Sequence, residues 1–176
     1  MKKIVIYIDG SNFYFSIKNK FNKKINIKRF CEKIAENNDL IKINYYIAPL
    51  TQKTHPTQYL EQQKFLEELK KIDKFNIIFG RLEKRRRDGD IFYVEKASDV
   101  NLALDLALDA EKGIYDEAYL VSNDGDFSGA VNAAKDFNKI EVYVAIGNRK
   151  AISYFLKKVA SRTFYITNNF IEDCTL

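Results

Sequence analysis

The chain has 176 residues, of which 46% are hydrophobic and 14% aromatic, with a formal net charge of +5 and a pI of about 9.0. This length suits one domain with a core of its own, and the apolar content argues against intrinsic disorder. No apolar run approaches the ~20 residues of a membrane span, and a charge this modest gives only weak support for a nucleic-acid partner. We therefore expect a single domain over residues 1–176 and no membrane partner.

The first residues predict a strand rather than a secretion signal. In MKKIVIYIDGSN the apolar stretch meets Asp9 after five residues, and no small-residue cleavage site is present. The two cysteines, Cys31 and Cys174, lie far apart and lack metal-type spacing. A reduced, cytoplasmic protein is the expectation from this pattern.

Strand and helix patterns alternate through the first half of the chain. Residues 2–8 form a β-branched run typical of a strand buried on both faces. Helix patterns follow in SNFYFSIKNKF and NIKRFCEKIAEN, then a strand over residues 42–49 and an amphipathic helix from Pro56. The segment KFNIIFGRLEKRRRDGDIFYVEKA alternates and turns at Asp88–Gly89, which predicts a β-hairpin.

The second half continues the alternation. It contains a helix in SDVNLALDLALDAEKG, a strand in EAYLVSN, a helix in DFSGAVNAAKDFN, a strand in KIEVYVAIG, a helix in RKAISYFLKKVA and a short strand in TFYITNN. This order predicts an α/β fold with a mostly parallel central sheet, helices on both faces and one antiparallel hairpin.

Aspartates stand at three junctions that follow predicted strands. Asp9 ends the first strand, Asp99 lies between the hairpin and the next helix, and Asp124 and Asp126 follow EAYLVSN. Open α/β sheets bind ligands at the carboxyl ends of their strands, so we expect these four carboxylates to converge. Grouped carboxylates repel one another, and Mg²⁺ or Mn²⁺ would compensate their charge and activate a water against a phosphodiester.

Each acidic motif also has a purely structural interpretation. Asp9 and Asp126 can serve as turn and helix-capping residues, and Ser98 or Asp99 can cap the helix that follows the hairpin. On that helix Asp99 shares a face with Leu102, which directs it toward the edge of the sheet. The polar stripe on the same helix, which we expect to be solvated, consists of Asn101, Asp105 and Asp109.

The segment after EAYLVSN also resembles the start of a calcium loop. Asp124, Asp126, Ser128 and Gly129 match positions 1, 3, 5 and 6 of an EF-hand. Position 12, which requires a bidentate glutamate, is Lys135, and a strand pattern replaces the entering helix. The sequence therefore excludes an EF-hand.

Three motifs together resemble a known family. YIDGSNFY, VEKASDVNLALD and LVSNDGDF, in this order, resemble the NYN domain, the LabA-like branch of the PIN-like ribonuclease superfamily, over about residues 2–146. The resemblance implies a PIN-like Rossmannoid three-layer fold, an acidic site for Mg²⁺ or Mn²⁺, and cleavage of RNA. Ala97–Ser98 and Gly125 depart slightly from the usual motifs.

The resemblance also assigns roles to individual residues. Asn12 would help to position phosphate or metal-bound water, and Lys96 and Ser122 match motif positions with supporting roles in substrate binding. The metal ligands and catalytic residues that it implies are Asp9, Asp99, Asp124 and Asp126.

A basic stretch lies apart from the acidic motifs. Arg85, Arg86 and Arg87 at the predicted hairpin tip would contact phosphates, while Phe92 or Tyr93 would offer a stacking face. The alternative is a solvated hairpin end. No nucleophile–histidine pair is identifiable for His55, the sole histidine, so a metal-activated water is the expected nucleophile.

The sequence therefore predicts a metal-dependent ribonuclease that acts on single-stranded or structured RNA. One alternative is a non-catalytic RNA-binding or partner-docking module with a vestigial acidic site. Another is a metal phosphohydrolase that acts on nucleotides. The sequence leaves open whether the chain forms homo-oligomers and whether residues 153–171 complete the fold or bind a partner.

Overall fold

The computed structural model describes residues 1–53 and 55–176. Within this part of the chain, six strands form one sheet in the order β3-β2-β1-β6-β7-β8, and all neighbouring strands are parallel. The strands are β1 (Lys3–Asp9), β2 (Asp39–Ile47), β3 (Phe75–Phe79), β6 (Glu117–Val121), β7 (Ile140–Ala145) and β8 (Arg162–Tyr165). The chain builds outward from β1 in one direction and from β6 in the other, so the strand order reverses between these two central strands.

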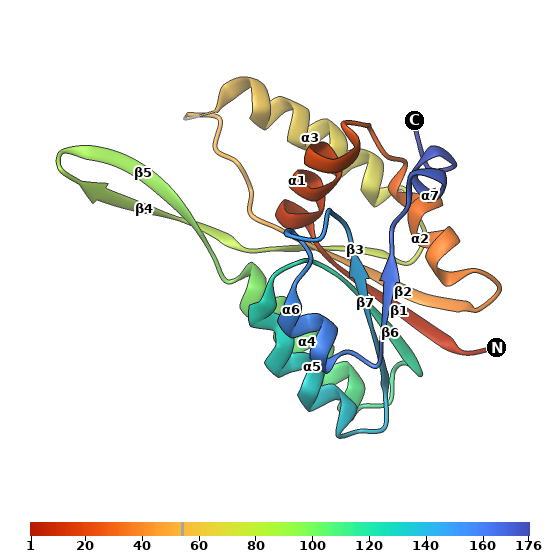
Figure 1. Cartoon of the computed structure of the whole chain (residues 1–176). Helices are drawn as coiled ribbons and strands as arrows, with labels where there is room; N and C mark the ends of the chain where they lie inside the picture. Colours follow the sequence, from red (N-terminus) through yellow and green to blue (C-terminus); the bar gives the residue numbers. More distant parts are fainter. Residues whose placement is uncertain (54) are drawn as a thin grey trace.

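Helices cover both faces of the sheet and make it a three-layer structure (Figure 1). One layer contains α1 (Gly10–Phe21), α2 (Ile27–Ala35), α3 (Pro56–Lys70) and α7 (Asn168–Glu172), and the other contains α4 (Ser98–Glu111), α5 (Ser128–Lys135) and α6 (Tyr154–Val159). Alternate residues of β1 point to opposite layers, as the period of a strand requires: Ile6 packs with Phe13 and Phe30, and Tyr7 packs with Leu102. The predicted α/β fold is confirmed.

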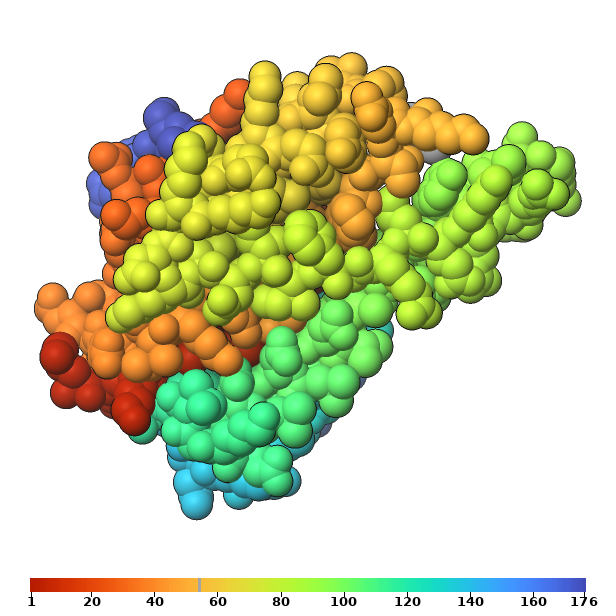
Figure 2. All heavy atoms as spheres, turned by 180° about the vertical axis from the view of Figure 1, so that it is seen from behind, coloured from red at the N-terminus to blue at the C-terminus, as the bar shows by residue number. Residues whose placement is uncertain are grey.

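The predicted hairpin extends from the body of the molecule as a separate two-stranded sheet (Figures 1 and 2). It consists of β4 (Arg81–Arg87) and β5 (Asp90–Lys96), which pair antiparallel. Asp88 and Gly89 form the turn with φ angles of 51° and 89°. Two adjacent residues with positive φ are typical of a two-residue hairpin turn, which is why Asp-Gly signals it in the sequence.

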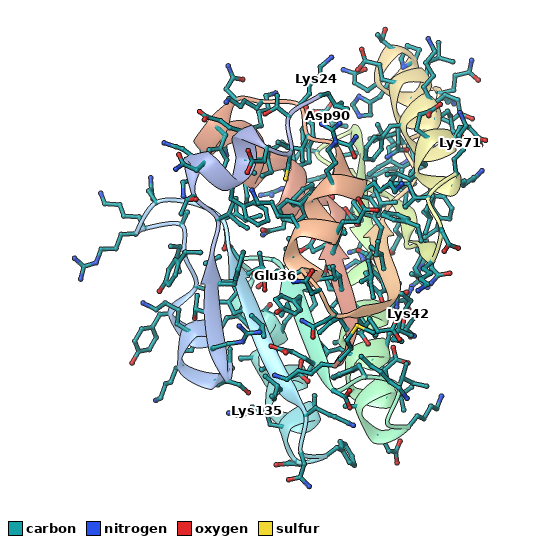
Figure 3. The ribbon with its side chains drawn as sticks, turned by 90° about the vertical axis from the view of Figure 1, so that its right-hand side faces the viewer. Lys24, Glu36, Lys42, Lys71, Asp90 and Lys135 are labelled. Atoms are coloured by element: carbon teal, nitrogen blue, oxygen red, sulfur yellow. The ribbon has the colours of Figure 1, made fainter. Side chains whose placement is uncertain are left out.

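The C-terminal segment completes the fold. The helix expected over residues 149–160 is shorter, because Ser153 caps it by accepting a 3.3 Å hydrogen bond from the Leu156 backbone N–H. β8 then adds a sixth parallel strand beside β7, and α7, which the sequence did not predict, places Phe170 and Ile171 in the core. The terminal Leu176 N–H donates to the carbonyl of Lys24, a residue labelled in Figure 3.

The polar stripe of α4 is not solvated, and this expectation was wrong. Asp109 is buried and accepts a 2.6 Å hydrogen bond from the Tyr7 hydroxyl, while Lys42 Nζ lies 2.6 Å from the same carboxylate oxygen (Figure 3 labels Lys42). Asp105 accepts a 2.8 Å hydrogen bond from the Tyr46 hydroxyl. The stripe faces the sheet because β1 and β2 supply donors that the helix sequence alone does not reveal.

Across the described residues, no helix combines the length and apolar character needed to cross a membrane. Cys31 and Cys174 are buried free thiols.

Candidate active site

An open cavity of about 640 Å³ lies at the point where the strand order reverses, beyond the carboxyl ends of β1 and β6. This is the position at which open α/β sheets bind ligands. α1 supplies one wall through Asn12, Phe15 and Ser16, and the segment after β7 supplies another through residues 146–148 and 151. The acidic residues that line the cavity are Asp9, Glu95, Asp99 and Asp124.

Asp9 is both a helix cap and an acidic wall of the cavity. Its Oδ1 accepts a 3.1 Å hydrogen bond from the Asn12 backbone N–H at the start of α1, and its Oδ2 accepts a 3.0 Å hydrogen bond from Ser122 Oγ. Burial raises the pKa of Asp9 to about 6, the two hydrogen bonds oppose this rise, and the charges of Asp99 and Glu95 add to it. The structural and functional interpretations of this residue are therefore compatible.

Asp124, beyond the end of β6, is likewise both a helix cap and a cavity-lining residue. It caps a short 3₁₀ helix (Gly125–Phe127) by accepting a 2.9 Å hydrogen bond from the Asp126 backbone N–H, and its own N–H donates to Ser122 Oγ at 3.1 Å. The alternative interpretation of Asp126 as the capping residue does not hold, because the helical turn begins earlier in the chain and Asp124 caps it. Asp126 is exposed and lies outside the cavity lining.

Asp99 lines the cavity from the first turn of α4 and remains partly exposed to solvent. Neither Ser98 nor Asp99 caps this helix; the N-cap position is Ala97, with a φ of 75° and no side-chain bond. Partial loss of solvent raises the pKa of Asp99, and neighbouring negative charges raise it further. Those charges belong to Glu95, Asp124 and Asp126.

Glu95 is an acidic residue of the cavity that the sequence reasoning missed. It stands near the end of β5, where its Oε1 accepts a 2.6 Å hydrogen bond from Ser98 Oγ and its Oε2 a 3.2 Å hydrogen bond from Ser11 Oγ. The available signal was its place in VEKASD, at the end of a strand and four residues before Asp99.

Asn12 and Asn123 join the two halves of the cavity wall. Asn12 Oδ1 accepts a 2.9 Å hydrogen bond from the Asn123 backbone N–H and a 3.3 Å hydrogen bond from Ser16 Oγ. Asn12 also lines the cavity, and its Nδ2 has no acceptor within residues 1–53 and 55–176. Its side chain thus fixes the loop after β6 and keeps a donor beside the carboxylates.

Gly10 allows α1 to begin close to β2. A Cβ at this position would lie 2.7 Å from the Tyr46 carbonyl oxygen and 2.7 Å from the Tyr45 ring. The glycine of the YIDGSN motif is therefore required by packing, and it lets Asp9 and Asn12 face the cavity from consecutive elements.

The other predicted substrate-binding residues lie outside the cavity lining. Ser122 is buried between Asp9 and Asp124, and Lys96 is exposed at the end of β5. Arg85, Arg86 and Arg87 belong to β4 and lead up to the hairpin tip.

The two faces of the hairpin differ in their relation to the cavity. Because side chains alternate along a strand and cross-strand partners share a face, Glu95 has Leu82, Tyr93 and Lys84 on its own face, followed by Arg86 and Ile91. Arg85 and Arg87 lie on the opposite face. There they form ion pairs with Glu83 at 3.1 Å and Asp88 at 3.7 Å, respectively.

The cavity has the donor chemistry of a magnesium or manganese site without a preformed cage. In the described part of the chain, no three His, Cys, Asp or Glu side chains are close enough to hold one ion together. The acidic donors are carboxylate oxygens, and burial, together with the charges of neighbouring carboxylates, raises the pKa values of Asp9 and Asp99. Mg²⁺ is commonly bound by one or two carboxylates together with waters, so this donor set fits such an ion.

Comparisons with known proteins agree with this architecture. The crystal structure of a protein of unknown function from Vibrio parahaemolyticus covers 99% of this chain and 96% of its own, with a TM-score of 0.74 and 23% identity, which establishes the fold alone. A search among curated proteins gave no match. The NYN domain model matches residues 3–168, and the chain therefore belongs to the NYN domain family, consistent with the PIN-like nuclease superfamily.

Proposed function

We propose that this protein is a metal-dependent ribonuclease that hydrolyses RNA phosphodiester bonds at the cavity between β1 and β6. The observation that carries the proposal is the convergence of Asp9, Glu95, Asp99 and Asp124 on one open cavity at the reversal of strand order. Membership of the NYN domain family supports nuclease-like chemistry for this cavity.

One or two of the carboxylates of Asp9, Asp99 and Asp124 would bind Mg²⁺ or Mn²⁺ directly and the others through waters, with Asp126 as an outer carboxylate. Such an ion supplies Lewis-acid activation of water and neutralises charge that develops on the phosphate. Ser122 orients Asp9 and the backbone of Asp124 through its two hydrogen bonds. The outer-shell partners of metal ligands fix their orientation in this way.

Other side chains of the cavity are placed to act on the phosphodiester itself. Asn12 Nδ2 can donate to a phosphate oxygen because its Oδ1 is already engaged by Asn123 and Ser16. Lys20 lines the same cavity and adds a cation beside the bound phosphate. Glu95, held by the Ser11 and Ser98 hydroxyls, adds a further carboxylate for solvent ordering.

The hairpin favours a polymer over a nucleotide as substrate. Lys84, Arg86 and Tyr93 share the hairpin face of Glu95, so cations and a ring follow from the cavity along one side of the arm. Arg86 pairs with Ile91, which lies four residues before Glu95 on β5. At a rise of about 3.3 Å per residue, Arg86 is therefore about 13 Å from Glu95 along the hairpin. A free nucleotide would not extend this far, whereas an RNA strand bound in the cavity would.

One observation favours a second candidate, an RNA-binding module with a vestigial acidic site. The carboxylates of the described residues do not form a three-ligand cluster that could hold an ion without rearrangement. A catalytically inactive relative would keep the basic hairpin and lose tight metal binding.

The decisive experiment incubates the purified full chain with end-labelled RNAs in Mn²⁺, in Mg²⁺ or in EDTA. Cleavage products in the metal reactions alone are the expected result. Tight, salt-sensitive binding without cleavage of several RNAs would instead identify the binding module. Metal-dependent release of phosphate from nucleotides, with intact RNA, would identify the phosphohydrolase.

A further inference from the structure

Two pairs of exposed aromatic rings lie near the acidic cavity and have no role in the acid chemistry. Tyr14 and Phe15 on α1 meet edge to face with ring centroids 5.2 Å apart, and Tyr154 and Phe155 at the start of α6 do the same at 5.7 Å. Their exposed fractions are 56%, 57%, 70% and 63%, respectively. Phe15 lines the cavity, and rings this exposed beside a cavity are typical of a binding surface.

The two aromatic pairs approach the cavity from different elements, α1 and α6. Phe15 lines it from the α1 wall. Phe155 packs at the other side, where a Cβ built on Gly125 would lie 3.2 Å from its ring atom Cδ2. Because Gly125 directly follows the lining residue Asp124, a ring of each pair, Phe15 from α1 and Phe155 from α6, lies beside the cavity.

Cations accompany the rings on both sides. Lys18 Nζ lies 5.7 Å from the centroid of the Tyr14 ring, and Lys20, two residues further along α1, lines the cavity. Arg149 and Lys150 are exposed in the segment between two cavity-lining residues that leads into α6. Rings with neighbouring cations suit a ligand that carries both π-faces and phosphates.

A hydrogen-bond network centred on Asn123 fixes the two pairs relative to each other. Asn123 donates to Asn12 Oδ1 at 2.9 Å and to Ser16 Oγ at 3.2 Å, both on α1. Its Oδ1 accepts a 2.6 Å hydrogen bond from the Tyr143 hydroxyl, which in turn accepts a 3.0 Å hydrogen bond from the Ser153 backbone N–H at the start of α6. A preorganised site of this kind loses little entropy on binding.

Building on the proposed function, we infer that the Tyr14–Phe15 and Tyr154–Phe155 pairs are stacking platforms for unpaired bases on either side of the scissile phosphodiester. They would select single-stranded RNA, because the bases of an A-form duplex are stacked on one another and offer no free face to a protein ring. Their outward position also leaves them free to accept bases of any identity, since every base has a π-face.

Binding without metal tests this inference separately from catalysis. Fluorescence anisotropy in EDTA would compare a labelled 12-nucleotide single strand with the same strand annealed to its complement. Phe15→Ala and Phe155→Ala should each weaken binding of the single strand about 5- to 100-fold, the range expected for loss of one base–ring stack. Phe15→Tyr and Phe155→Trp should restore binding, because these rings retain a stacking face.

Phe137→Ala is the matched control. Phe137 is also an exposed ring, but it precedes β7 and so lies at the opposite edge of the sheet from the cavity. This variant should bind the single strand as the wild type does. Thermal melts of all variants should agree with the wild type, since the replaced rings are exposed.

Several results would overturn the inference. Unchanged single-strand affinity in both alanine variants would do so, as would equal binding of duplex or no binding of the single strand at all. Light scattering that shows a dimer in the wild type and a monomer in Phe155→Ala, with RNA affinity unchanged, would assign the rings to a second copy of the chain. If the wild type binds RNA through these rings but does not cleave it in the presence of metal, the proposed catalysis would be refuted and the stacking inference would stand.

Discussion

Ser122 connects the ends of the two central strands, because its Oγ donates a 3.0 Å hydrogen bond to Asp9 Oδ2 and accepts one of 3.1 Å from the Asp124 N–H. Ser122→Ala should therefore raise the pKa of Asp9 above about 6, since it removes a hydrogen bond to the ionised carboxylate. It should also lower the free energy of unfolding by about 1–2 kcal/mol, because the Asp124 N–H loses its acceptor. Carbon-detected NMR titration of the Asp9 carboxyl and urea unfolding measure the two effects.

Ser128→Ala is the control for this prediction. The Ser128 hydroxyl has no hydrogen-bond partner among the described residues, and its side chain lies in the first turn of α5. The control should leave both the Asp9 titration and the unfolding free energy unchanged. An unshifted Asp9 titration in Ser122→Ala would show that the Ser122–Asp9 bond is absent in solution.

Asp124→Asn should separate the catalytic role of Asp124 from its capping role. Asparagine caps a helix about as well as aspartate, so the melting temperature should stay within a few degrees of the wild type. Metal-dependent RNA cleavage should fall more than about 100-fold, because even the outer partners of metal ligands typically contribute 10- to 100-fold. A radiolabelled cleavage assay in Mn²⁺ and a thermal melt make the measurement.

Asp136→Asn provides the matched change of charge. Asp136 is exposed at the end of α5, away from the carboxyl ends of the strands, and should have no effect on cleavage. Wild-type cleavage by Asp124→Asn would remove Asp124 from the proposed metal site.

Two double variants, one on each face of the hairpin, remove the same number of positive charges and can be compared directly. The double variant Lys84→Ala/Arg86→Ala removes cations from the face of Glu95, and Arg85→Ala/Arg87→Ala removes two cations from the opposite face. We expect the first to weaken RNA binding more, and to reduce the slope of log K against log salt by about 1.4, at 0.7 per contacted phosphate of a single strand. Anisotropy titrations over a range of salt concentrations measure it. Equal effects of the two pairs would indicate that the hairpin contributes only net charge.

Much of the fold could be predicted from the sequence because the signals for its strands, helices and hairpin turn lie in short stretches of neighbouring residues. The buried run before Asp9, the Asp88–Gly89 turn and the alternation of strands with helices each depend on neighbouring residues. The family motifs add specificity, and the match over residues 3–168 confirms them. The positions of Asp9 and Asp124 at strand ends also predicted that they lie at one edge of the sheet, and in the structure both line the same cavity.

The features that escaped the sequence depend on contacts between distant segments. Glu95 reaches the cavity only because the hairpin strand returns beside Ser11, 84 residues away in the chain. Asp109 is buried because Tyr7 and Lys42 lie across from it on the sheet. Asn123 is the last residue of the strand pattern EAYLVSN, and that pattern does not reveal its partners Asn12 and Tyr143, which come from other elements. Periodicity describes which face a residue occupies and leaves its partner on that face undetermined.

Glu141, far from the cavity, should make stability depend on pH. Its Oε1 accepts a 2.7 Å hydrogen bond from Tyr115, and its buried Oε2 has no partner among the described residues. Burial raises the pKa of Glu141 to about 7, against the lowering effects of Tyr115, Lys135 and Lys139. The folded state therefore keeps a proton that the unfolded chain releases near its ordinary pKa of 4.5.

Consequently, the free energy of unfolding should fall as the pH rises from about 4.5 to about 7 and then level off, with Glu141 contributing at most about 3 kcal/mol at 1.36 kcal/mol per pKa unit. Glu141→Gln removes the titrating group and should flatten this part of the profile. Glu111→Gln, an exposed change at the end of α4, should leave the profile as it is. Urea unfolding in EDTA at pH 5, 6, 7 and 8 compares the three proteins. An identical slope in Glu141→Gln and the wild type would mean that Glu141 is ionised throughout this range in the folded protein.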